Sequence, residues 1–481
     1  MTLTTQTAPS APVGGTGFTA RVKRHTGQIM LLSGPIIVSN VAIMTMEIVD
    51  TLMVGHFDTI ELAYQGIASA VLFPMLVCGI GFMQGTQIAV SNAFGAGDLK
   101  RCGECLRLSI PYAIFFGLLG TLICLAGEPV LRLLGQEADI ARGGGEVVRI
   151  LGLGLPAILI AVACAGFLDG LGRPMAGMIV ILVANLVNAF GNWVLVYGNF
   201  GAPAMGATGS AWATVAVRWM MIPAIILCIA LLVDRRAFGL DQLGDRLSRM
   251  VSADAFRWLW RQSAFQRKIG FAFATGFFVE AFAFEALTIY AGWIGAEEIA
   301  AYTIAFRTLG VIFMVSLGIA VATGVRVGIA NGRNDKRDVA IAGWVGMGIN
   351  FFIAAFVGVV VALNAEAIAS LFSRDEMLII LATPAIVLCG VMIVFDGGQV
   401  VAVRALRSRG DAWIPTILHA VSYIGIMLPL TWYLALPLGR GLPGLFEGAI
   451  IASIVAVSLQ MLRFAWLSRS DRHQEGRLDP A

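Results

Sequence analysis

Apolar stretches of about 20 residues recur along almost the whole chain of 481 residues, and about 20 apolar residues are what a helix needs to cross a bilayer. There are twelve, at roughly 29–54, 62–93, 106–127, 148–168, 175–197, 207–233, 269–290, 299–330, 339–363, 381–403, 415–436 and 446–467. The second and eighth are long, and the regular polar punctuation predicts one long helix for each. With 58% hydrophobic and 13% charged residues, the chain is predicted to be an all-α polytopic membrane protein with twelve transmembrane helices.

The polar segments outside these stretches predict the orientation of the chain. Residues 1–28 and 468–481 are expected to be flexible tails, and the basic segment 234–268 is expected to lie on the membrane surface. If both termini are cytoplasmic, 26 of the 33 Lys and Arg residues fall on that side, as the positive-inside rule requires. We therefore expect a multi-pass protein of the bacterial inner membrane with both termini in the cytoplasm, and no nucleic-acid partner.

The two halves of the chain are related in sequence. Residues 55–98 align without a gap on residues 292–335, and 12 of the 44 positions are identical. The shift from one copy to the other spans an even number of helices, so both copies have the same orientation and an axis along the membrane normal would relate them. We predict two six-helix lobes with pseudo-two-fold symmetry, an N-lobe (29–233) and a C-lobe (269–467), joined by the linker 234–268.

Carboxylates inside the apolar stretches are the strongest functional signal, because a charged side chain at the bilayer centre costs about 2.5–3.5 kcal/mol. Asp50 lies in the outer third of the first stretch, while Glu280 and Asp396 lie near the middle of the seventh and tenth. Such residues usually mark ion or substrate pathways. Two alternatives stay open: Asp50 as an acid at the membrane interface, and Glu280 and Asp396 as structural ion-pair partners of Arg218 or Arg307.

Uncharged residues beside these acids carry a second signal. Asn188 and Asn192 are four residues apart in the fifth stretch and share one helix face. Such a pair of amides can join helices within lipid, or it can exchange hydrogen bonds with a carboxylate, water or a cation. Asp396 is followed by Gly397 and Gly398, which permit a close backbone approach or a local unwinding.

Other chemistry has little support in the sequence. Most of the seven cysteines lie in apolar runs, and Cys102 and Cys105 form a single C-x-x-C without the second pair that a zinc site needs. The four histidines are scattered, and no phosphate-binding P-loop is present. We therefore expect neither a cofactor nor an enzymatic activity.

Several segments together resemble one known family, the multidrug and toxic compound extrusion (MATE) transporters. "GPIIVSNVAIMTMEIVDTLMVG" (34–55) is similar to the first helix of that family, and residues 188–214 resemble the fifth-to-sixth helix signature of its NorM-type branch. "FFVEAFAF", "RVGIANGRND" and "DGGQVVAVRALRSRGD" resemble the motifs of the seventh, eighth and tenth helices. The resemblance covers roughly residues 29–467.

The resemblance implies two sets of binding residues for cations or substrates, which are Asp50, Asn188 and Asn192 in the N-lobe and Glu280 and Asp396 in the C-lobe. The family's C-lobe site often adds a tyrosine one turn before the tenth-helix acid, where this chain has Met392. A thioether is a poor ligand for a hard cation. The C-lobe site is therefore expected to share a proton, while Na⁺ at Glu280 and Asp396, or at Asp50, remains an alternative.

The expected function is a monomeric, cation-coupled multidrug efflux antiporter that exports cationic or amphipathic aromatic compounds by alternating access. Burial favours the neutral form of a carboxylate, so Asp50 is expected to switch between two charge states. A proton or Na⁺ bound from outside would cancel its charge and weaken the hold on a cationic drug. The alternatives are a lipid-linked precursor flippase, which requires a basic cavity, and a membrane-embedded enzyme.

Overall fold

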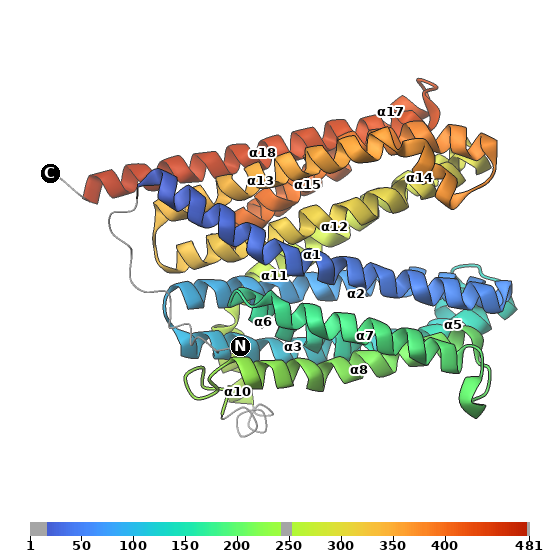
Figure 1. The fold of residues 1–481 in the computed structure, drawn as a ribbon, viewed down its shortest axis with the longest axis horizontal. Coiled ribbons are helices and arrows are strands. Elements are labelled where there is room, and N and C mark those ends of the chain that lie inside the picture. Colours follow the sequence, from blue (N-terminus) through green and yellow to red (C-terminus); the bar gives the residue numbers. More distant parts are fainter. Residues whose placement is uncertain (1–16, 242–252, 479–481) are drawn as a thin grey trace. The chain divides into compact units, whose positions relative to one another are not determined.

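The computed structural model describes residues 17–241 and 253–478, and all regular elements in these two ranges are helical (Figure 1). Eleven helices are long and apolar enough to cross a membrane, and twelve spans result if one bent pair counts as a single span. This pair is α5 (Ala138–Gly152) and α6 (Leu155–Gly170), which meet at 41°. The prediction of an all-α polytopic protein is confirmed. The count of twelve spans is reached only if the bent pair α5 and α6 is one broken span.

The helices of the first half are α1 (Phe18–Phe57), α2 (Thr59–Gly95), α3 (Leu99–Leu125), α4 (Gly127–Leu133), α5, α6, α7 (Pro174–Leu195), η1 (Asn199–Gly201) and α8 (Gly206–Leu232). Those of the second half are α10 (Ala253–Gln262), α11 (Ala264–Ile294), α12 (Ala296–Gly332), α13 (Lys336–Leu363), α14 (Ala365–Phe372), α15 (Glu376–Ser408), α16 (Trp413–Ala420), η3 (Val421–Met427), α17 (Leu428–Ala435) and α18 (Gly441–Leu478). The long stretches in α2 and α12 each form one unbroken helix, as predicted.

The internal repeat is visible in these bounds. Helices α2 and α12 begin at Thr59 and Ala296, and α3 and α13 begin at Leu99 and Lys336. Both pairs of starting residues are separated by the same shift that relates residue 55 to residue 292 in the sequence. The repeat therefore extends from the sequence to the starting positions of these helices.

An aspartate caps the start of both α3 and α13. Asp98 accepts a hydrogen bond from the backbone N–H of Arg101 at 2.9 Å, and Asp335 accepts one from the backbone N–H of Asp338 at 2.8 Å. Aspartate at this position satisfies a backbone donor that has no partner within the helix. This local chemistry explains why the aspartate is identical in both copies.

Packing divides the described residues into two compact units with limits that differ from the predicted lobes. The N-terminal unit lies within Val38–Phe94 and Asp98–Ala274, and the C-terminal unit within Met1–Ile37, Gly95–Gly97 and Thr275–Ala481. Helices α1 and α11 are consequently divided between the two units. Helix α1 starts in the C-terminal unit and continues into the N-terminal unit, and α11 starts in the N-terminal unit and continues into the C-terminal unit.

The expected tails are shorter in the structure. Helix α1 already begins at Phe18, so residues 18–28 are helical and are not a flexible tail. At the other end α18 continues to Leu478, beyond the predicted limit of residue 467. Within the expected linker, the structure describes α10 and the beginning of α11. Residues 1–16, 242–252 and 479–481 lie outside the described part of the chain.

Close helix contacts within each unit occur at small residues. In the C-terminal unit a Cβ atom added to Gly358 would lie 2.0 Å from the carbonyl oxygen of Gly390, which joins α13 to α15. In the N-terminal unit a Cβ atom on Gly117 would lie 2.4 Å from the Cα atom of Pro156, which joins α3 to α6. Glycine permits this approach, and van der Waals contact between backbones holds helices together where lipid offers no hydrophobic driving force.

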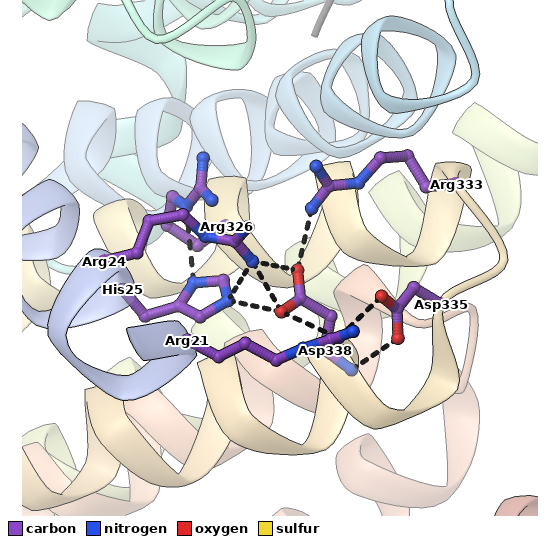
Figure 2. Close-up of polar contacts among 7 residues, drawn as sticks. All are labelled: Arg21, Arg24, His25, Arg326, Arg333, Asp335 and Asp338. Atoms are coloured by element: carbon purple, nitrogen blue, oxygen red, sulfur yellow. Dashed lines mark hydrogen bonds and ion pairs between the residues drawn. The ribbon is translucent and has the colours of Figure 1, made fainter. Parts of the chain in front are cut away.

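An ion network holds the start of α1 within the C-terminal unit (Figure 2). Asp338, at the start of α13, accepts hydrogen bonds from Arg24 at 2.6 and 2.8 Å and from Arg333 at 2.7 Å. Arg21 pairs with the capping residue Asp335 at 2.7 Å. Asp338 is buried, so these arginines supply the donors that a carboxylate removed from water needs.

A buried histidine completes this network. The His25 Nε2 atom lies 3.0 Å from Asp338, and its Nδ1 atom lies 3.5 Å from Nε of Arg326 (Figure 2). An arginine N–H can only donate, so Nδ1 accepts and Nε2–H donates to the carboxylate. The geometry therefore fits a neutral imidazole with one defined tautomer.

The other unit contains the corresponding contact with different chemistry. Under the shift that relates the two halves, His25 corresponds to Gln262 and Asp338 to Arg101. Arg101 donates to the carbonyl oxygen of Gln262 at 2.9 Å. One turn on, Gln266 at the start of α11 donates to Ser109 Oγ on α3 at 3.0 Å. Both units thus hold the start of a helix from the other half of the chain, one with an ion network and one mainly with neutral hydrogen bonds.

We expect Asp338→Asn to loosen the start of α1, because it leaves several partly buried cations without their carboxylate. Removing one partner of a buried ion pair costs about 3 kcal/mol. Trypsin should then cleave faster after Arg21, Lys23 or Arg24, and thermal unfolding in detergent should begin at a lower temperature. Glu128→Gln is a suitable control because its ion pair with Arg132 is much more exposed. Wild-type cleavage kinetics in Asp338→Asn would show that the network does not anchor the helix.

Candidate functional site

Asp50 is buried in the N-terminal unit and accepts hydrogen bonds from two other helices. Oδ1 accepts from the amide of Asn192 on α7, and Oδ2 accepts from the Thr214 hydroxyl on α8 at 3.0 Å. Only 7% of the residue is exposed. Asp50 thus lies among protein donors from α7 and α8, which does not fit an acid that faces water at the interface.

The paired amides of α7 belong to the same cluster. Asn188 donates to Thr214 Oγ1 at 3.3 Å, and Asn192 lies 3.4 Å from the Asn188 carbonyl oxygen. Both amides are buried, whereas Asn185 bonds to the backbone of its own helix. The structure therefore brings together the three predicted residues of this half and adds Thr214, whose hydroxyl links Asn188 to Asp50.

Two further charged residues, Glu47 and Arg218, lie near the Asp50 cluster. Glu47, one turn before Asp50 on α1, is exposed. The positive charge of Arg218 on α8 interacts with both acids. Arg218 therefore belongs to the surroundings of Asp50, and the alternative in which it neutralises Glu280 or Asp396 loses its basis.

The C-terminal unit contains the second acidic cluster. Asp396 on α15 is buried and accepts a hydrogen bond from the hydroxyl of Tyr423. The charge of Glu280 on α11 interacts with those of Asp396 and Arg407. Arg307 is exposed, so the cation beside Glu280 is Arg407 and is not one of the two arginines considered from the sequence.

The expectation that this cluster lacks a phenol is wrong. Met392 is indeed buried one turn before Asp396, but Tyr423 supplies the phenol from another helix. Tyr423 lies in η3, a π-helical segment of seven residues. Segments of this kind are rare and occur frequently at functional sites.

One face of α16 and η3 lines this second cluster. Thr416 accepts from Arg407 at 2.8 Å, and His419 lies 3.2 Å from the side-chain oxygen of Gln399. Tyr423 follows on the same face. Sequence reasoning missed these residues, although their spacing of three and four in an apolar segment was a usable signal.

Gly397 explains how α12 and α15 approach each other beside Asp396. A Cβ atom at this position would lie 2.2 Å from the hydroxyl oxygen of Ser316 on α12. Helix α15 is continuous from Glu376 to Ser408. Of the two possibilities raised by the paired glycines, the structure therefore shows close approach without unwinding.

Cys102 and Cys105 lie in the packed interior of the N-terminal unit as free thiols. Cys102 and Cys105 are buried thiols in α3, and the Cys102 sulfur lies 3.7 Å from the backbone oxygen of Val90. In residues 17–241 and 253–478 there is no group of three or more His, Cys, Asp or Glu side chains suited to a metal ion.

Comparison with known proteins places this arrangement in a family. The MatE family model matches residues 35–194 and 273–433. A probable multidrug resistance protein NorM from Caulobacter vibrioides is 34% identical over 446 residues, which is 92% of each chain. The multidrug resistance protein NorM of Vibrio cholerae is 27% identical and covers 93% of this chain and 97% of its own length.

Solved structures support the same fold. An outward-facing multidrug resistance MATE family transporter superposes with a TM-score of 0.82 over 97% of this chain and all of its own, at 18% identity. A eukaryotic MATE transporter gives 0.81 over 94% and 99% of the two chains, also at 18% identity. The family model and the Caulobacter relative carry the assignment: the chain belongs to the MatE family of multidrug efflux transporters.

Proposed function

We propose that the protein is a cation-coupled multidrug exporter that works by alternating access. The observation that carries this proposal is the pair of buried acidic clusters, one around Asp50 and one around Glu280 and Asp396, in two related halves of an apolar chain. Buried carboxylates in membrane spans are costly and usually belong to ion or substrate pathways. Two such clusters provide separate places for a drug and for a coupling ion.

The cluster at Asp50 is the proposed site for a cationic drug. An ionised carboxylate attracts a cation, while the amides of Asn188 and Asn192 offer hydrogen bonds to varied polar groups. The named relatives are multidrug resistance proteins, which supports drugs as substrates, and the carboxylate of Asp50 favours cationic ones. Release requires a state of the protein with a lower affinity for the drug, since exchange depends on different drug affinities in the two states.

The cluster at Glu280 and Asp396 is the proposed coupling site, and its ion is the proton. The thioether of Met392 is no longer an argument for the proton, because Tyr423 supplies the missing phenol. The argument for the proton is now the positive charge of Arg407 beside Glu280. A guanidinium repels Na⁺ at close range, whereas two acids beside one arginine can share a single proton.

A lipid-linked precursor flippase remains the second candidate, but the charges do not favour it. A pyrophosphate headgroup requires a basic cavity, as the strong Arg–phosphate interaction shows. The clusters described above contain three acids, of which Asp50 and Asp396 are buried, against two arginines, Arg218 near Asp50 and Arg407 near Glu280. We therefore retain drug export, by a monomer in the bacterial inner membrane with both termini cytoplasmic.

We expect Asp50→Asn to abolish most resistance to cationic drugs, because it removes the charge and preserves the shape. Export of ethidium by cells that contain equal amounts of wild-type and variant protein measures this effect. Asp58→Asn is the matched control, since Asp58 is an exposed acid near the end of the same helix. Undiminished ethidium export by Asp50→Asn would exclude Asp50 as a drug-binding charge.

For coupling, an imposed pH gradient should drive drug movement in sodium-free proteoliposomes. Glu280→Gln should reduce this movement at least tenfold, because one of the two acids can then no longer take up a proton; a tenfold change corresponds to about 1.4 kcal/mol. Glu285→Gln is a control on the same helix, five residues away. Transport that requires a sodium gradient at fixed pH would overturn the proton assignment and leave the exporter assignment intact.

A further inference from the structure

His419 is a buried histidine with two nitrogens in different environments. Only 4% of the residue is exposed, and Nδ1 lies 3.2 Å from the side-chain oxygen of Gln399. The Nε2 atom has no hydrogen-bond partner within the described part of the chain. An unpaired buried acceptor is unfavourable, so the contacts through Nδ1 and the ring are the ones that hold this histidine in place.

The neighbours of His419 define which nitrogen carries its proton. Gln399, one turn after Asp396 on α15, forms a further hydrogen-bond contact with the Asp396 carboxyl group. An ionised carboxylate only accepts, so the NH₂ group of Gln399 faces Asp396 and its carbonyl oxygen faces His419. That oxygen also only accepts, and therefore Nδ1 of His419 carries the proton while Nε2 is a bare acceptor.

His419 also contacts the second donor to Asp396. Its ring stacks on the ring of Tyr423 with centroids 4.3 Å apart and planes inclined by 24°. The Tyr423 hydroxyl donates to Asp396. Both donors to this acid, the Gln399 amide and the Tyr423 phenol, are therefore held by the same imidazole, one through a hydrogen bond and the other through a stacked ring.

We propose that His419 is a positioning residue of the C-terminal acidic cluster, where its Nδ1–H orients the Gln399 amide so that an N–H faces Asp396. This inference rests on the proposed role of Asp396 in coupling. The donors that face a carboxylate decide how readily it holds a proton. His419 thereby sets the pH at which Asp396 exchanges its proton, without touching the drug or the ion.

The other charged and titratable groups of the cluster come from three elements. Glu280 faces it from α11, and Arg407 and Asp396 from α15, while Tyr423 faces it from η3. The charge of Arg404 on α15 acts on Arg407. Substitution of His419 removes none of these groups, and His419→Phe also keeps a ring beside Tyr423, so a shift of the pH profile in His419→Phe reports on the lost Nδ1–H donor.

Three substitutions separate the two nitrogens. In His419→Asn the amide nitrogen can occupy the place of Nδ1 and keep the donor to Gln399. His419→Gln places its amide near the position of Nε2 and loses that donor, and His419→Phe keeps only the stacked ring. The measurement is ethidium transport in proteoliposomes as a function of pH, with maximal rate and half-saturating ethidium concentration recorded separately.

We expect His419→Asn to keep the wild-type pH profile. His419→Gln and His419→Phe should move it toward higher pH by roughly half to one unit, the equivalent of one hydrogen bond of about 1 kcal/mol. The half-saturating ethidium concentration should not change. A wild-type profile in His419→Phe, or an equal shift in all three variants, would overturn the proposal. If His419→Phe does not fold, the comparison of Asn with Gln decides the question.

Two controls separate this inference from the proposed function. His56→Phe replaces an exposed histidine and should leave the profile unchanged. Asp396→Asn should remove pH-driven transport altogether. Normal pH-driven transport in Asp396→Asn would refute the coupling role itself. Lost transport in Asp396→Asn, together with wild-type profiles in all His419 variants, would refute only the role of His419.

Discussion

A carboxylate removed from water must find its hydrogen-bond donors within the protein, and this requirement organises the interior of both units. Asp50 on α1 takes its donors from α7 and α8. Asp396 on α15 takes one from η3. Asp50 therefore joins helices that are distant in the sequence, whereas Asp396 joins α15 to η3, which follows it after one short helix. Where such polar contacts are lacking, glycine contacts and apolar packing hold the helices together.

The two clusters satisfy this requirement with different chemistry. The hydrogen-bond donors to Asp50 are a neutral amide and a neutral hydroxyl, which can adapt to different ligands, and the charge of Arg218 also acts on this acid. A phenol donates to Asp396 and a guanidinium acts on Glu280, while the His419 imidazole contacts the donors to Asp396. The two halves share the starting positions of two helices and a capping aspartate, but their binding chemistry has diverged. This divergence is the physical basis for proposing drug binding in one cluster and proton exchange in the other.

The sequence by itself determined the membrane environment, the number of spans, the internal repeat and the acids Asp50, Glu280 and Asp396. These properties depend on local composition and on the cost of charge in lipid, which a linear chain displays directly. The spacing of four residues placed Asn188 and Asn192 on one helix face, and the family resemblance assigned both to the site of Asp50. The beginning of α1 at Phe18 was not predicted, because the polar residues there are held in a helix by contacts with Asp335 and Asp338, which are distant in the sequence.

Only the tertiary structure decided which side chains surround each acid. Thr214, Tyr423, His419 and Arg407 are separated from their partners by long stretches of sequence or lie on helices whose rotation the sequence does not fix. The absence of a tyrosine at position 392 misled the sequence reasoning, because a phenol can reach the same carboxylate from any neighbouring helix. Helix propensity and hydropathy depend on neighbours along the chain, whereas the donors to a buried charge are chosen by packing in three dimensions.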